Sequence, residues 1–166
     1  MSHLPGPSGP SWQSEMQMPF KAEALPLVRR QLLAEVRAHH IDDDVAYDAA
    51  LVLSELVSNA LRHASPLREG VLSVEWGCWD DQLHICVTDG GATTEPHVAP
   101  AAPHATGGRG LAIVRAVCLE WGLDRTPAAT TVWASLRASV TGPSVACAAS
   151  RPTPVGASIS APDRPR

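Results

Sequence analysis

Glu55 and Asn59 are the residues of this chain whose types and spacing first suggest chemistry. They lie four positions apart in residues 51–64, LVLSELVSNALRHA, a run of helix formers without Gly or Pro. At about 100° per residue, Glu55, Asn59 and Arg62 share one face of a helix. A carboxylate and an amide one turn apart can converge on a single ligand. The same stripe also fits an ordinary solvated helix face, and this stretch alone leaves both interpretations open.

The helix that would carry these residues has clear limits. Residues 42–44 are all Asp, which offers an N-cap and favourable negative charge at a helix start. The Ser65-Pro66 step ends the helix, because the residue before a proline avoids helical geometry. Its apolar face is formed by Ala49, Leu53, Leu56, Val57, Ala60 and Ala64.

Two glycine-containing motifs lie at the ends of a segment of about twenty residues without periodicity. DGG at residues 89–91 ends an apolar strand pattern and places a carboxylate at its tip, beside backbone that a ligand can approach. GGRGL at residues 107–111 opens a helix pattern, where free N–H groups and the helix dipole suit phosphate. Taken singly, the first is more often a turn and the second a hinge. The segment between them is typical of a functional lid or a disordered insertion.

The remaining patterns predict an α+β domain. Residues 71–79 and 83–89 alternate apolar and polar side chains around a short turn, which indicates an antiparallel hairpin. Helices on one face of a mainly antiparallel sheet follow from the order of elements. In chain order we expect a strand at 16–22, helices at 25–39 and 42–64, the hairpin, a helix at 110–121 capped by Gly122, a turn at 126–128 and a strand at 131–136.

Composition narrows the class of protein. With 166 residues and 45% apolar content, the chain suits one domain, which we place at residues 16–138 between disordered tails at 1–15 and 139–166. Acids outnumber bases by 17 to 13, which argues against direct binding of nucleic acid. Neither a long apolar run nor a signal peptide occurs, so we expect a cytoplasmic protein without a membrane segment. The four cysteines form no CxxC pair, and we expect free thiols instead of a zinc site.

Taken together and in order, the motifs resemble those of the histidine-kinase-like ATPase (GHKL) superfamily. Within it the chain is most similar to anti-sigma factor serine kinases and related actinobacterial regulators. ALVLSELVSNALRHA resembles the first motif, VTDGG the second, TGGRGLAIV the third and TTVWASL the closing strand, so that the likeness covers residues 18–136. It implies a Bergerat-type two-layer α/β sandwich, with helices on one face of the sheet and ATP under a long lid.

The resemblance also implies roles for individual residues. Asn59 would be the Mg²⁺ ligand that bridges the metal to the phosphates, and Glu55 would be the general base. Asp89 would accept a hydrogen bond from the adenine amino group, and Gly91 would let the base approach. Either Thr130 or Thr131 would support the adenine, and the sequence leaves open which one faces it. The phosphates would lie against Gly107, Gly108, Arg109, Gly110 and Leu111.

The function implied is that of an ATP-binding regulator and protein serine/threonine kinase. Such a protein transfers the γ-phosphoryl group to a Ser or Thr of an anti-anti-sigma factor and controls a sigma factor by partner switching. Two alternatives stay open: a catalytically inactive nucleotide-binding switch and a detached histidine kinase catalytic domain. The sequence also leaves open whether the protein forms a homodimer, as relatives often do. One departure bears on the phosphate loop, since Thr93 stands where the second motif has its second glycine.

Overall fold

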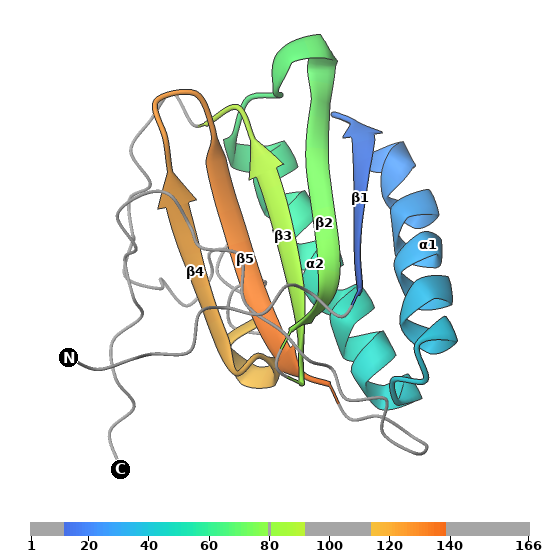
Figure 1. The fold of residues 1–166 in the computed structure, drawn as a ribbon. Helices are drawn as coiled ribbons and strands as arrows, with labels where there is room; N and C mark the ends of the chain where they lie inside the picture. Colours follow the sequence, from blue (N-terminus) through green and yellow to red (C-terminus); the bar gives the residue numbers. More distant parts are fainter. Residues whose placement is uncertain (1–11, 80, 92–113, 139–166) are drawn as a thin grey trace, which may run out of the picture.

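The computed structural model describes residues 12–79, 81–91 and 114–138 and contains one five-stranded sheet (Figure 1). The strand order is β1-β2-β3-β5-β4, and every neighbouring pair is antiparallel. The strands are β1 (Trp12–Pro19), β2 (Val71–Trp79), β3 (Gln82–Asp89), β4 (Glu120–Arg125) and β5 (Thr130–Arg137).

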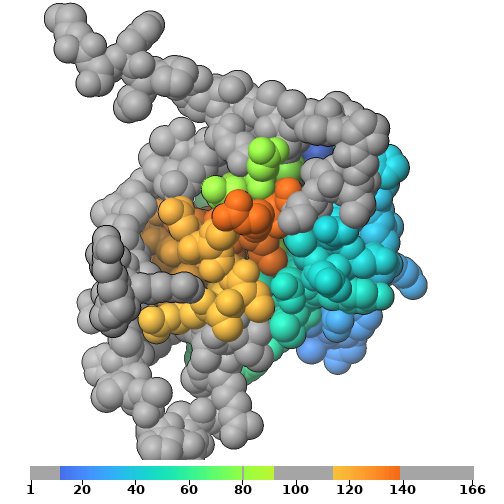
Figure 2. Space-filling view, turned by 90° about the horizontal axis from the view of Figure 1, so that it is seen from below, coloured from blue at the N-terminus to red at the C-terminus, as the bar shows by residue number. Residues whose placement is uncertain are grey.

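Two antiparallel helices, α1 (Leu25–Ala38) and α2 (Asp43–His63), form a second layer on one face of the sheet. In that layer α2 packs against β3 and β5, and α1 packs against α2 and β1. From below, α2 in teal lies directly beside the orange part of the sheet that β4 and β5 form (Figure 2). Two single turns of 3-10 helix, η1 (Ala22–Ala24) and η2 (Arg68–Gly70), precede α1 and β2. The predicted α+β fold with helices on one face is therefore confirmed.

The core lies between the helices and the sheet, and its largest fully buried side chain is Trp76 of β2. The indole N–H of Trp76 donates a hydrogen bond of 2.9 Å to Glu35 Oε2 on α1, so that a polar pair fixes α1 against the sheet. Facing strand residues such as Ile85 and Ala134 pair directly and are both completely buried. Because the core is closely packed, the sheet holds the end of β3 in a fixed position.

The boundaries expected from periodicity agree well for α1, α2 and the β2–β3 hairpin. The first strand, however, spans Trp12–Pro19 and not residues 16–22, so residues 12–15, predicted to belong to a tail, form part of β1. Trp12 pairs with Cys78 of β2 and stacks on the His39 ring, with centroids 4.1 Å apart and planes 4° from parallel. The Pro, Gly and Ser residues before Trp12 obscured the alternation of this strand.

The predicted helix at 110–121 is wrong at its end. Residues 114–117 are helical, but Glu120–Arg125 forms β4 at the edge of the sheet. Gly122, expected to cap a helix, lies opposite Trp133 in this strand pair. A Cβ at Gly122 would lie 2.5 Å from the Trp133 ring, so the bare backbone here makes room for the indole. Residues 110–113 lie outside the described part of the chain.

The cysteines that the structure describes differ in their bonding. Cys86 and Cys118 are free thiols, and burial raises the pKa of each to about 12. Both are therefore protonated at neutral pH. Cys78 is disulfide-bonded, so the expectation of free thiols is wrong there. Among the described residues, no helix is long and apolar enough to cross a membrane.

Candidate functional site

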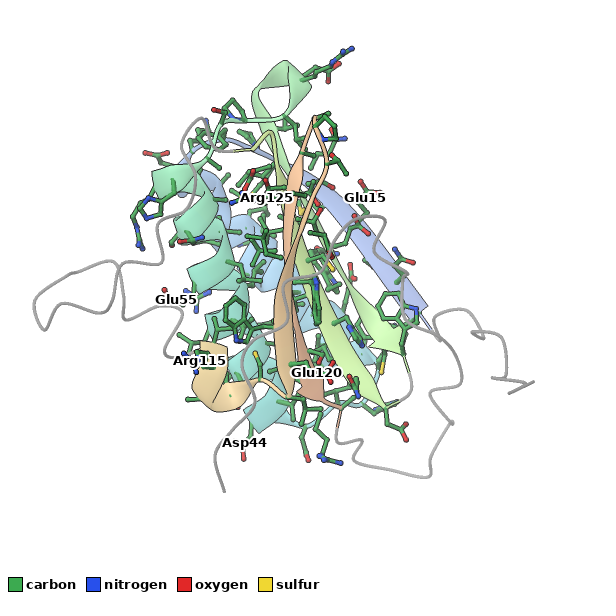
Figure 3. The ribbon with its side chains drawn as sticks, turned by 90° about the vertical axis from the view of Figure 1, so that its left-hand side faces the viewer. Glu15, Asp44, Glu55, Arg115, Glu120 and Arg125 are labelled. Carbon is green, nitrogen blue, oxygen red and sulfur yellow. The ribbon has the colours of Figure 1, made fainter. Side chains whose placement is uncertain are left out.

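The helical half of the candidate site is the stripe on α2 that carries Glu55 and Asn59. Both side chains are half-buried, and neither makes a hydrogen bond or an ion pair in the part of the chain that the structure describes. Figure 3 shows Glu55 projecting from α2 on the side away from the sheet, with Arg115 below it. Leu56 and Ala60, next to them in sequence, are buried in the core. These buried neighbours hold α2 in place. Within the described residues, the polar groups of Glu55 and Asn59 have no partner.

The sheet half of the site begins with Asp89, the last residue of β3, which is 3% exposed. The backbone N–H of Gly91 donates a hydrogen bond of 2.7 Å to Asp89 Oδ1. Burial raises the pKa of Asp89, and this effect is opposed by the Gly91 N–H and by the positive charge of Arg125. Within the described residues no other hydrogen bond reaches this carboxylate, which leaves Oδ2 to accept one from a ligand.

Two backbone hydrogen bonds tie the end of β3 to the end of α2. Gly90 N–H donates to Ser65 O and Ser65 N–H donates to Gly91 O, each at 2.9 Å. A Cβ at Gly90 would lie 2.2 Å from Pro66 O, so only glycine permits this approach. These bonds fix Asp89 relative to the helix that carries Glu55 and Asn59. The sequence predicted that Gly90 lets a ligand approach the backbone, whereas the structure places the Pro66 carbonyl against it.

Gly91 differs from Gly90 in both conformation and surroundings. Its φ of +84° is in the left-handed region that favours glycine. A Cβ there would meet nothing closer than Thr130 Oγ1 at 3.8 Å. Among the described residues, therefore, nothing crowds the backbone beside Asp89, which is compatible with a residue that lets a flat ligand approach.

The register of β3 and β5 separates Thr130 from Thr131. Thr130 pairs with Asp89, and Thr131 pairs with Thr88. Paired residues project to the same face of a sheet, so Thr130 lies with Asp89 on the face that the helices cover. Thr131 projects to the opposite face, where its hydroxyl lies 2.9 Å from the Thr88 hydroxyl. Of the two candidates left open by the sequence, Thr130 is the one on the Asp89 side.

The glycine-rich third motif lies outside the described residues. This applies to Gly107, Gly108, Arg109, Gly110 and Leu111, as well as to Thr93. The structure therefore brings together Asp89, Gly91 and Thr130 and ties them to the helix of Glu55 and Asn59. The phosphate-binding role of residues 107–111 stays a prediction.

The described residues fit a nucleotide with its metal. Asp89 offers a carboxylate oxygen to a donor such as the amino group of adenine, beside the open backbone of Gly91. Asn59 and Glu55 offer oxygen atoms, the ligand type that Mg²⁺ prefers. In the part of the chain described, no three His, Cys, Asp or Glu side chains form a metal cluster. A divalent metal here would therefore depend on phosphate oxygens as well as protein ligands, which is the usual arrangement for Mg²⁺.

The sheet order and the single layer of helices define a two-layer α/β sandwich. A family model described as the histidine kinase-like ATPase domain matches residues 18–136. The chain belongs to the histidine kinase-like ATPase family.

Curated proteins that are similar to this chain are named serine-protein kinase RsbW. The protein from Bacillus licheniformis is 30% identical over an alignment of 120 residues, and the match covers 64% of this chain and 74% of that protein. The protein from Bacillus mycoides is 28% identical over 79 residues, 48% of this chain and 49% of that protein. This chain thus spans about half the length of the Bacillus mycoides relative.

A solved structure supports the fold. It contains the RsbU and RsbW domains of a protein from Mycobacterium tuberculosis, and it matches this chain with a TM-score of 0.59 at 20% sequence identity. The match covers 90% of this chain and 36% of the mycobacterial chain. At this identity the likeness concerns the arrangement of helices and strands.

Proposed function

We propose that this protein binds Mg-ATP beside α2 at the end of β3 and transfers the γ-phosphoryl group to a serine or threonine of a partner protein. The observation that carries the proposal is the link between the two halves of the site. The hydrogen bonds of Ser65 hold Asp89 and Gly91 against the end of the helix that presents Glu55 and Asn59. This link gives a base-binding residue and two candidate catalytic side chains one fixed geometry.

On the base side, Asp89 Oδ2 accepts a hydrogen bond from the adenine amino group, while Oδ1 stays paired with Gly91 N–H. Thr130 lies on the same face and supports the base with its hydroxyl. Because Asp89 is buried, water competes little for these hydrogen bonds. Because Gly91 N–H already occupies Oδ1 of Asp89, Oδ2 is the oxygen that selects the amino group of adenine.

On the phosphate side, Asn59 would hold Mg²⁺, and Glu55 would accept the proton of the attacking hydroxyl. Mg²⁺, when bound, neutralises charge on the phosphates. Glu55 and Asn59 lie one helical turn apart on α2, so a hydroxyl near Glu55 is also near the metal. The work of the protein is positioning and electrostatic stabilisation.

The partners proposed are a sigma factor and an anti-anti-sigma factor, in the cytoplasm. This follows from the resemblance of the motifs and from relatives named serine-protein kinase RsbW. The phosphorylated residue is then a serine or threonine of the anti-anti-sigma factor, whose modification releases it from this protein. We also propose that the protein forms a homodimer.

Calorimetric titration with ATP, with and without Mg²⁺, tests the site. Wild type should bind in the micromolar range, Asp89→Asn should abolish binding, and Asn59→Ala should remove its magnesium dependence. Glu55→Gln should keep binding but lose phosphoryl transfer to a candidate antagonist. No heat from folded wild type at millimolar ATP would refute nucleotide binding, and binding without transfer to any antagonist would identify a switch without turnover.

Thr130→Val and Thr131→Val form a matched pair for the base side. Loss of one hydrogen bond is worth about 1 kcal/mol, so Thr130→Val should weaken ATP binding roughly fivefold. Thr131→Val, on the opposite face, should leave ATP affinity unchanged. Equal effects of the two variants would contradict the assignment of Thr130 to the base.

A further inference from the structure

Arg125, the last residue of β4, lies in one cross-strand row with Asp89 and Thr130. Thr130 pairs with Asp89 of β3 on one side and with Arg125 of β4 on the other. Directly paired residues project to the same face of a sheet, so all three side chains lie on the face that the helices cover. Figure 3 shows Arg125 toward the upper end of the sheet, while Glu120, at the other end of β4, lies toward the lower end.

The charge of Arg125 acts on the Asp89 carboxylate. Burial raises the pKa of Asp89, and Arg125 is the charged side chain that opposes this effect, together with the Gly91 N–H. Other charged groups face the same end of the molecule from α2 and the following loop. These are Arg62, His63, Arg68 and Glu69, none of them buried. None of these four is among the groups that shift the pKa of Asp89.

We propose that Arg125 is a positioning residue of the nucleobase site, whose guanidinium holds Asp89 as the carboxylate that a 6-aminopurine requires. This inference rests on the proposed function, because it assigns the base to Asp89. The reason lies in the hydrogen-bond inventory of the carboxyl group. Gly91 N–H occupies Oδ1, so protonation would put an O–H donor on Oδ2, facing the amino donor of adenine.

The charge state of Asp89 also affects which purine base the site prefers. Adenine presents an amino donor at position 6, and hypoxanthine presents a carbonyl acceptor there. A charged Asp89 accepts from the first and repels the second, whereas a protonated Asp89 can donate to the carbonyl. Arg125 therefore supports the preference for ATP over inosine triphosphate, and it does so most strongly at acid pH.

The nucleotide-free protein provides the first test. Because Gly91 N–H donates to Asp89, the amide resonance of Gly91 in NMR reports the titration of that carboxyl. In Arg125→Gln the midpoint should rise by about half a pH unit, a modest shift because Arg125 is exposed and screened. Arg125→Lys should restore the wild-type midpoint, and Arg137→Gln, at the far end of β5, should not alter it.

Nucleotide titrations provide the second test. As the pH falls through the wild-type Gly91 midpoint, Arg125→Gln should bind ATP more weakly than wild type, by at most about threefold, and should discriminate less against inosine triphosphate. Near pH 8 the two proteins should match. An unchanged Gly91 midpoint, or equal loss of ATP affinity at both pH values, would overturn the proposal. If the Gly91 midpoint shifts but wild type binds no nucleotide, the coupling of Arg125 to Asp89 stands while the nucleobase role and the proposed function fall.

Discussion

Replacing Gly90 by alanine should separate the proposed base-binding residues from the helix that carries the candidate catalytic side chains. The added Cβ would lie 2.2 Å from Pro66 O and 3.2 Å from Ser65 O. These are backbone atoms, which cannot rotate aside as a side chain can. The turn that follows Asp89 must therefore move off the end of α2, with loss of the hydrogen bonds from Gly90 N–H to Ser65 O and from Ser65 N–H to Gly91 O.

The size of the effect follows from these two bonds. Each is worth about 1 kcal/mol net, and more where a buried group is left unpaired, so we expect a loss of roughly 2–3 kcal/mol. A domain with about 5–15 kcal/mol of stability remains folded after this loss. The melting temperature should fall by roughly 8 °C. ATP affinity should fall at least about tenfold, because Asp89 and Asn59 are no longer held in one geometry.

Two other glycines provide matched controls. Gly70 has a φ of +74°, and a Cβ added there would meet nothing within 4 Å, so Gly70→Ala tests backbone strain alone. This strain should cost about 1–2 kcal/mol. Gly91→Ala adds similar strain at the base site, and it should weaken ATP binding as well. Differential scanning fluorimetry and ATP calorimetry on the three variants separate these effects. The reasoning fails if Gly90→Ala melts like Gly70→Ala and binds ATP like wild type.

Two glutamates should change stability with opposite dependence on pH. Burial opposes ionisation of Glu35, but hydrogen bonds, including the one from the Trp76 indole, outweigh it and lower its pKa. Its contribution is therefore present at neutral pH and lost as the pH falls through about 4. Glu35→Ala should cost about 1–3 kcal/mol in urea unfolding at pH 7, and a gap that stays constant down to pH 3 would contradict this. Burial and the facing Glu15 raise the pKa of Glu75, so folding favours its neutral form and is penalised as the pH rises. Glu75→Gln should raise the melting temperature at pH 7 by roughly 2 °C and not below about pH 4, whereas a lower melting temperature at pH 7 would refute this account.

The elements with strong periodicity could be predicted from the sequence. In α2, buried residues recur at helical spacing along the helix, which ends before Ser65-Pro66 as expected. The β2–β3 hairpin has the predicted alternation and a short turn. Because these two elements carry Glu55, Asn59 and Asp89, the positions of these three residues in the fold could be predicted from the sequence, while their roles stay a prediction.

The missed strand shows where local pattern fails. Glu120–Arg125 has a glycine in its middle and follows directly on a helical turn, so that nothing in its sequence distinguishes it from a helix end. Its conformation depends on pairing with β5, where the Trp133 ring takes the space that a side chain at Gly122 would need. This is a tertiary effect that overrides local propensity. Since Arg125 belongs to β4, its position beside Thr130 could not be predicted from the sequence either.

The two glycines after Asp89 show that a motif can predict a site without predicting what each of its residues does there. In sequence, Gly90 and Gly91 are equivalent, and both suggest a close approach of backbone. In the structure, Gly90 makes room for the carbonyl of Pro66, and Gly91 takes a left-handed conformation beside open space. The difference comes from a loop more than twenty residues earlier in the chain. Gly90 therefore belongs to the architecture that joins the two halves of the site, and Gly91 to the surface that would receive the base.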